Sequence, residues 1–123
     1  MFHAVIAGTG RAVPAKVLTN ADLETLVDTT DEWIVARTGI RERHMAGDGE
    51  VLSDFCVEAA TQALSSAGVQ AKDLDAVVIA TVTPDQPIPA VACLVQQKLG
   101  AKKAAAWDQN AGCSGWLYGL HIA

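Results

Sequence analysis

A run of small and β-branched apolar residues, Ala-Val-Val-Ile-Ala-Thr-Val at positions 76–82, most constrains the fold of this chain. A strand that is apolar at every position is typical of a sheet covered on both faces. The proline-rich segment 83–89 ends this strand, and a helix over residues 90–99, closed by Gly100, leads to another strand over residues 103–107. Strands that alternate with helices predict an α/β fold with a mostly parallel sheet and covering helices.

The first residues predict one more strand. Residues 3–7 alternate weakly and are rich in Val and Ile, and they run into the turn Gly8-Thr9-Gly10. These glycines do not complete the dinucleotide-binding pattern G-x-G-x-x-G, because Val13 stands where its last glycine is required.

Capping patterns predict two short helices. Thr19 can cap a two-turn helix. Thr29, with Glu32 three residues later, matches a capping box, and Gly39 is a suitable stop, so a second helix is expected over residues 30–38.

A charged segment and a longer helix follow. Residues 41–44, Arg-Glu-Arg-His, alternate in charge and are expected to lead into a loop at 47–49. The longer helix is predicted to be capped by Ser53 and ended by Gly68. Its small and apolar residues recur on one stripe at helical spacing: Cys56, Ala60, Ala63, Leu64 and Ala67. Such a stripe is expected to pack closely.

The net charge argues against a nucleic-acid partner, and the short apolar runs argue against a membrane-spanning segment. Nine Lys and Arg against fourteen Asp and Glu give a net charge of −5 without a basic cluster, so no nucleic acid is expected to bind. The longest apolar runs, 76–80 and 90–95, are far shorter than the roughly 20 residues of a membrane-spanning helix. Because no secretory signal begins the chain, a cytoplasmic location is expected.

Length and cysteine usage limit the domain organisation. The 123 residues suit one small domain or a piece of a larger one, and the apolar, uncapped segment 119–123 suggests that the chain stops within a domain. The three cysteines form neither a disulfide framework nor a C-x-x-C pair, so a free thiol and no metal site are expected.

Cys113 is the candidate nucleophile. The segment Ala-Gly-Cys-Ser-Gly at 111–115 places its thiol between small residues at a predicted strand-to-helix turn, where the helix amino terminus favours thiolate. The alternative is a buried structural cysteine at a tight corner. Cys56 and Cys93 lie within helical patterns and are assigned to packing.

Thr29, Trp33 and Arg37 are spaced by four and line one face of the second short helix. An indole beside a guanidinium can stack a flat heterocycle, and an arginine can hold a phosphate. The alternative is that Trp33 belongs to the core and that Arg37 pairs with an acid.

Several segments together resemble the amino-terminal part of β-ketoacyl-[acyl-carrier-protein] synthase III, a condensing enzyme of the thiolase superfamily. They are residues 20–24, 28–44, 58–60, 78–81, 92–93 and 108–115. The resemblance implies a thiolase-like α/β fold, with residues 1–123 as the amino-terminal part of the domain and the carboxy-terminal half absent. The family's catalytic His and Asn lie in that second half.

The resemblance also implies a reaction and its residues. Cys113 would take an acyl group from an acyl-CoA, acetyl-CoA foremost, and malonyl-acyl carrier protein would lose carbon dioxide and condense with it, starting type II fatty-acid synthesis in a homodimer. The coenzyme A thioester is a substrate, and no cofactor is implied. Thr29, Trp33 and Arg37 correspond to residues at the adenine end of coenzyme A. Ile88 corresponds to a residue of the partner subunit's acyl pocket that is commonly aromatic, which leaves the acyl-chain preference open.

Two other functions fit the sequence. One is a thiolase-fold acyltransferase of a secondary-metabolite pathway. The other is a non-catalytic piece that binds a partner through an open sheet edge and an apolar helix.

Overall fold

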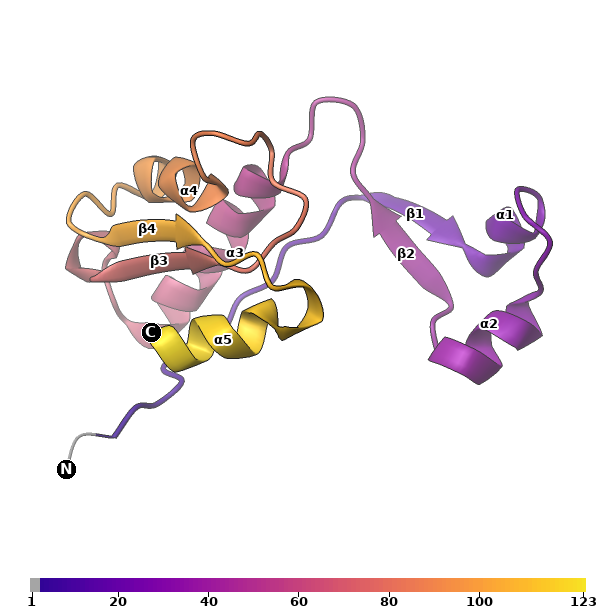
Figure 1. Ribbon diagram of the computed structural model, residues 1–123, viewed down its shortest axis with the longest axis horizontal. Helices are drawn as coiled ribbons and strands as arrows, with labels where there is room; N and C mark the ends of the chain where they lie inside the picture. Colours follow the sequence, from indigo (N-terminus) through magenta and orange to yellow (C-terminus); the bar gives the residue numbers. More distant parts are fainter. Residues whose placement is uncertain (1–2) are drawn as a thin grey trace. The chain divides into compact units, whose positions relative to one another are not determined.

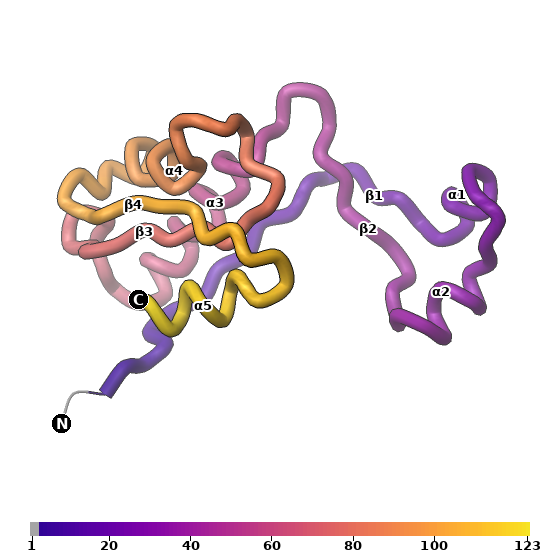
Figure 2. The backbone as a smooth tube through the Cα atoms, in the orientation of Figure 1, coloured from indigo at the N-terminus to yellow at the C-terminus, as the bar shows by residue number. Residues whose placement is uncertain are grey.

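The computed structural model describes residues 3–123, which form two compact units (Figures 1 and 2). The larger unit consists of residues 3–12 and 51–123, and the smaller unit is Val13–Glu50. No helix among the described residues is long and apolar enough to cross a membrane.

The larger unit is built on two parallel strands. β3 (Ala76–Ile79) pairs with β4 (Ala105–Asp108), with Ala76 opposite Ala105. α4 (Val91–Leu99) makes the crossover between them. The remaining helical elements are α3 (Leu52–Ala67), η1 (Ala71–Asp73), η2 (Gly112–Ser114) and α5 (Gly115–Ile122). α3 and α4 cover one face of the strand pair and α5 lies over the other (Figure 1).

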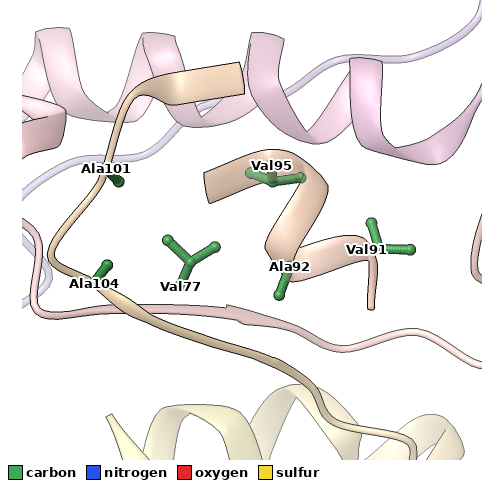
Figure 3. Packing of buried hydrophobic residues seen from close by; sticks show 6 residues of the cluster. All are labelled: Val77, Val91, Ala92, Val95, Ala101 and Ala104. Carbon is green, nitrogen blue, oxygen red and sulfur yellow. The ribbon is translucent and has the colours of Figure 1, made fainter. Parts of the chain in front are cut away.

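The two faces of β3 confirm that its apolar run reflects a strand covered on both sides. Val77 points into the core between the strands and α4, where it joins residues of α4 and of the segment before β4 (Figure 3). These core residues are Val77, Val91, Ala92, Val95, Ala101 and Ala104. The neighbouring Val78 faces α5 instead, in contact range of Gly119. Successive side chains of a strand point to opposite faces, so each face needs its own apolar residues.

The strand predicted at residues 3–7 is absent, and the prediction was wrong. Val5 and Ile6 are 80% and 71% exposed, and neither lies in a ladder. The following residues pack across α3 instead. A Cβ added at Gly8 would lie 2.9 Å from Ala67 N, and a Cβ added at Gly10 would lie 2.8 Å from Ala63 N. The small residues of α3 therefore pack closely against this segment. A β-branched pattern forms a strand only where a neighbouring strand pairs with it.

The smaller unit contains an antiparallel pair that the sequence did not reveal. β1 (Lys16–Thr19) pairs with β2 (Glu42–Met45), with Thr19 opposite Glu42. Between them lie α1 (Asn20–Glu24) and α2 (Asp31–Thr38). The charged residues of β2 were expected to lead into a loop and were not predicted to form a strand. A strand is predicted from alternating apolar and polar residues, and this largely exposed pair lacks that pattern.

The predicted helix ends are partly confirmed. Thr19 caps α1 in a capping box with Asp22, and Gly39 ends α2 with a φ of 72°. The predicted amino-terminal cap of α2 was one residue off: Thr30, rather than Thr29, accepts a hydrogen bond from Trp33 N at 3.2 Å.

The cap predicted for α3 was wrong. Its capping position is held by Val51, which has no side-chain acceptor, and Ser53 lies buried in the first turn. The predicted ends of α3 and α4 are confirmed, since Gly68 and Gly100 both adopt a left-handed conformation there.

Candidate active site

Cys113 lies in a tight turn between β4 and α5. Its side chain is exposed, which excludes the buried structural cysteine considered from the sequence. Gly112 has a φ of 52°, a left-handed conformation that glycine adopts without strain. Ser114 N donates to the Ala111 carbonyl at 3.1 Å and closes the turn. The thiol is therefore accessible at a strand-to-helix turn, as the sequence predicted.

The turn is anchored to the sheet at both of its ends. Gln109 N donates to the Ile79 carbonyl at 2.7 Å, which continues the β3–β4 pairing by one residue. On the far side, a Cβ added at Gly115 would lie 3.2 Å from the Gln109 carbonyl oxygen and 3.4 Å from Ala80 Cβ. The first turn of α5 thus sits directly against the end of β3, and this contact limits where Cys113 can lie.

Two carboxylates satisfy the amino termini of helices to which they do not belong. Both oxygens of Asp108 accept from α4, from Val91 N and Ala92 N at 2.8 Å each. Asp85 accepts from Ser53 N of α3 at 3.2 and 3.3 Å. The first N–H groups of a helix have no partner within it, and a carboxylate at that end is also favoured by the helix dipole.

Sequence reasoning missed both carboxylates, because each lies far along the chain from the helix that it caps. An indirect signal was available. The residues that precede the two helices, Val51 and Ala90, carry no side-chain acceptor. A helix start without its own capping residue indicates an acceptor supplied from elsewhere in the fold.

The other two cysteines are half-buried in the larger unit. Cys56 is half-buried and packs against the hydrophobic core. Burial raises the pKa of the Cys56 thiol above its usual range, and the negative charges of Asp85 and Asp108 raise that pKa further. Cys93 Sγ donates to the Ala106 carbonyl at 3.8 Å. Their assignment to packing is consistent with these contacts.

A second candidate site lies on α2 in the smaller unit. Trp33 is 57% exposed, so it is not the core residue that the alternative required. The guanidinium carbon of Arg37 lies 5.5 Å from the centroid of the Trp33 ring. Trp33 and Thr29 also line an open pocket of about 280 Å³, together with Asp28 and Thr30. No described residue forms an ion pair with Arg37. The structure thus places the exposed side chains of Trp33 and Arg37 together on α2, and it places the half-buried Thr29 beside Trp33, just before the helix begins.

A buried asparagine holds α2 in place. Asn20 is 2% exposed, and its Nδ2 donates to Asp31 Oδ1 at 2.7 Å and to the Ile40 carbonyl at 2.9 Å. Its Oδ1 accepts from Arg43 of β2. Asp31 N also donates to Glu24 Oε1 at 2.6 Å, which links the first turn of α2 to α1. Sequence reasoning missed this network, since nothing local marks Asn20 as buried.

Ile88 lies in the loop between β3 and α4 and is 86% exposed. That loop follows β3, and the Cys113 turn follows β4. Because the strands are parallel, both segments leave the same edge of the sheet. The structure therefore places Ile88 and Cys113 in loops at one edge of the larger unit.

No protein-family model matches the chain, but curated proteins and solved structures do. A β-ketoacyl-[acyl-carrier-protein] synthase III of Roseiflexus sp. is 54% identical over 121 residues, covering 98% of this chain. The chain spans only 37% of the length of that relative.

Solved structures have the same fold. The 3-oxoacyl-[acyl-carrier-protein] synthase III of Aquifex aeolicus matches with a TM-score of 0.90 and 48% identity, over 95% of this chain and 38% of its own. The priming β-ketosynthase of the R1128 polyketide pathway matches with a TM-score of 0.90 and 36% identity, over 96% of this chain and 35% of its own. The chain is therefore the counterpart of the amino-terminal part of β-ketoacyl-[acyl-carrier-protein] synthase III, and it has the thiolase-like α/β fold of that family.

Proposed function

We propose that this chain supplies the acyl-accepting part of a β-ketoacyl-[acyl-carrier-protein] synthase III that starts type II fatty-acid synthesis. The observation that carries the proposal is the exposed thiol of Cys113 at a strand-to-helix turn, in a chain 54% identical to a synthase III. A cysteine whose thiol is exposed at a strand-to-helix turn is suited to nucleophilic catalysis, because substrate can reach it.

In the proposed reaction, the Cys113 thiolate attacks the carbonyl carbon of an acyl-CoA thioester. The bond from that carbon to the sulfur of coenzyme A breaks, and coenzyme A leaves as a thiolate that takes up a proton. Malonyl-acyl carrier protein then loses carbon dioxide, and the resulting carbanion attacks the acyl carbon and releases the Cys113 thiolate. Covalent catalysis of this kind divides one difficult step into two easier ones. The His and Asn that assist the second step in the family would come from the part of the protein beyond this chain.

The proposed site for the adenine end of coenzyme A is formed by the exposed Trp33 and Arg37 and the half-buried Thr29. The open face of the Trp33 ring can stack a base, and Arg37 lies close enough to this ring to hold a neighbouring phosphate. The pocket beside Trp33 offers room for part of such a ligand.

Ile88 is proposed to enter the acyl pocket of the partner subunit in a homodimer. Its 86% exposure leaves the side chain free for such a contact. An aliphatic residue at this position is smaller than an aromatic one and leaves more room for the acyl chain. A cytoplasmic location and malonyl-acyl carrier protein as the second substrate complete the proposal, which requires no cofactor beyond the coenzyme A thioester.

Acylation of Cys113 tests the proposed function directly. The full-length protein that contains this chain is incubated with acetyl-CoA and digested, and the modified peptide is identified by mass spectrometry. We expect a mass increase of one acetyl group on the peptide that carries Cys113, and none in Cys113→Ala. Cys56→Ala is the matched control, and it should acylate like the unmodified protein. An unmodified Cys113 with acetyl groups elsewhere would contradict the proposal.

A second candidate function is the priming of a secondary-metabolite pathway, which the similarity to the R1128 priming β-ketosynthase favours. The two functions differ in the second substrate. Condensation assays should compare malonyl-acyl carrier protein with malonyl-CoA and should include carrier proteins of both kinds of pathway. Preference for the fatty-acid carrier protein supports the first function, and preference for the polyketide carrier protein or for malonyl-CoA supports the second.

A further inference from the structure

The Asp108 carboxylate joins the two loops that carry Cys113 and Ile88. Its Oδ2 accepts from Val91 N and its Oδ1 accepts from Ala92 N, both at 2.8 Å. Val91 is the first residue of α4 and follows Ile88 by three positions. Asp108 itself is the last residue of β4, and Cys113 follows it by five positions. One side chain therefore connects the end of one loop with the start of the other.

Nothing else in α4 can replace this connection. The capping residue of α4, Ala90, has no side-chain acceptor, so the Asp108 carboxylate is the side-chain partner of its first N–H groups. Val91 and Ala92 are both fully buried, so water cannot take the place of the carboxylate without rearrangement. A carboxylate that accepts two backbone N–H groups forms strong, charge-assisted hydrogen bonds with defined geometry.

The backbone on the other side of Asp108 is also held. Gln109 N is bound to the Ile79 carbonyl at 2.7 Å, at the point where the chain leaves β3 for the Ile88 loop. Hydrogen bonds thus connect the Cys113 turn to both ends of the Ile88 loop. The Gln109–Ile79 backbone bond lies at the start of that loop, and the Asp108 carboxylate binds Val91 N at its end. A displacement of Asp108 would change the position of one loop relative to the other.

We propose that Asp108 is a positioning residue, which sets the rate and the acyl-chain selectivity of Cys113 acylation by holding the Ile88 loop and the Cys113 turn in one arrangement. The inference rests on the proposed function, because it needs Cys113 to accept the acyl group and Ile88 to enter the partner subunit's acyl pocket. It differs from a purely stabilising role, in which the loss of Asp108 would weaken the fold without changing which thioester is preferred.

The test uses three variants of the full-length protein. Asp108→Asn keeps the shape of the side chain but leaves one oxygen to serve two donors. Val91→Pro removes one donor while Asp108 stays intact, and proline is well tolerated at the first position of a helix. Val95→Ala is the matched structural control. Val95 lies on α4, is 1% exposed in the hydrophobic core and is not one of the hydrogen-bond donors to Asp108, so its truncation weakens the core packing and leaves both of those hydrogen bonds in place.

The rate of Cys113 acylation is measured by mass spectrometry with acetyl-CoA and with isobutyryl-CoA, alongside the melting temperature. Asp108→Asn is expected to slow acylation by about tenfold or more, since misplacing reacting groups by about 1 Å can slow a reaction by about 100-fold. In both Asp108→Asn and Val91→Pro, the ratio of the two acylation rates should shift in the same direction. Val95→Ala should lower the melting temperature and leave that ratio unchanged.

Each outcome decides between the roles. If Asp108→Asn and Val91→Pro lose stability but keep the acylation ratio of Val95→Ala, the inference is overturned. The same holds if both variants fail to fold while Val95→Ala folds, because Asp108 would then serve stability alone. If the unmodified protein is not acylated at Cys113 by either thioester, the proposed function fails, which is a distinct result.

Discussion

The guanidinium of Arg37 lies over the face of the Trp33 ring, with 5.5 Å from its central carbon to the ring centroid. The two residues are four positions apart on α2, so the helix itself brings them together. The pair leaves more than half of the Trp33 surface exposed. One α2 surface therefore offers both an aromatic face and a cation to a ligand.

Trp33→Ala is predicted to weaken the use of acetyl-CoA. Stacking of a base on an aromatic ring contributes about 1–3 kcal/mol, so KM for acetyl-CoA should rise by about 5- to 150-fold, with a smaller effect on kcat. Trp33→Phe keeps an aromatic face and should lose less. Steady-state kinetics with acetyl-CoA and with acetyl-pantetheine, which lacks the adenine end, provide the measurement. An equal loss with both substrates would contradict an adenine site at Trp33.

Gly10→Ala is predicted to destabilise the larger unit. The added Cβ would lie 2.8 Å from Ala63 N and closer still to the Ala59 carbonyl oxygen, and backbone atoms cannot move aside as a flexible side chain can. Overpacking of this kind lowers the free energy of unfolding by about 1–3 kcal/mol. The loss should appear as a lower denaturant midpoint followed by circular dichroism.

Gly47→Ala is the matched control for that substitution. Its Cβ would have its nearest neighbour at 3.5 Å, the Glu50 carboxylate, and Gly47 has no positive φ. The stability of Gly47→Ala should therefore be unchanged or slightly higher. Equal effects of the two substitutions would mean that residues 8–10 do not pack on α3 as described.

Asn20→Ala is predicted to loosen the smaller unit. It removes the partner of the Arg43 guanidinium and of the Ile40 carbonyl, and a hydrogen bond to a charged group contributes about 1.5–3 kcal/mol. Hydrogen exchange of the α2 and β2 amides should become faster, while that of α4 stays unchanged. Asn110→Ala, at an exposed asparagine, should leave the exchange of α2 and β2 as it is. Unaltered exchange in Asn20→Ala would contradict the anchoring role.

Cys56 is predicted to react slowly with alkylating agents in the folded protein. Its raised pKa means that less thiolate exists at a given pH than in the unfolded chain, where the pKa returns to the ordinary value of 9.0. Native Cys113→Ser protein at pH 8 should therefore label at Cys56 much more slowly than the same protein in urea. Mass spectrometry of the labelled peptides gives both rates, and equal rates would contradict the burial of this thiol.

The raised pKa of Cys56 also predicts how the stability of the fold depends on pH. The unfolded state ionises first as the pH rises through 9.0, because its pKa is the lower of the two. The stability associated with a neutral Cys56 is thus present below that pH and declines above it. Cys56→Ala should show a smaller decline in melting temperature between pH 8 and pH 10 than the protein with Cys56 intact.

Much of the larger unit could be predicted from local patterns. The apolar run at β3, the glycines at the ends of α3 and α4, and the Gly-Cys-Ser turn before α5 each act through neighbouring residues, so their signals lie within a few positions of one another. The proximity of Trp33 and Arg37 likewise follows from the geometry of one helix, whereas Thr29 lies just before that helix begins. These features were recognised without any knowledge of the tertiary contacts.

Tertiary structure alone decided the remaining features. Residues 3–7 match a strand pattern but pair with no strand, and the charged β2 carries no strand pattern but pairs with β1. No local sequence pattern distinguishes Asn20 and Asp108 from other polar residues. Apart from the Asn20–Asp31 bond, their hydrogen-bond partners lie 16 or more positions away along the chain. The sequence by itself determined the local elements and the turn that exposes Cys113, because propensity and periodicity operate over short distances. Which strands pair and which side chains cap distant helices was decided by the fold, because hydrogen-bond partners become definite only when remote segments are brought together.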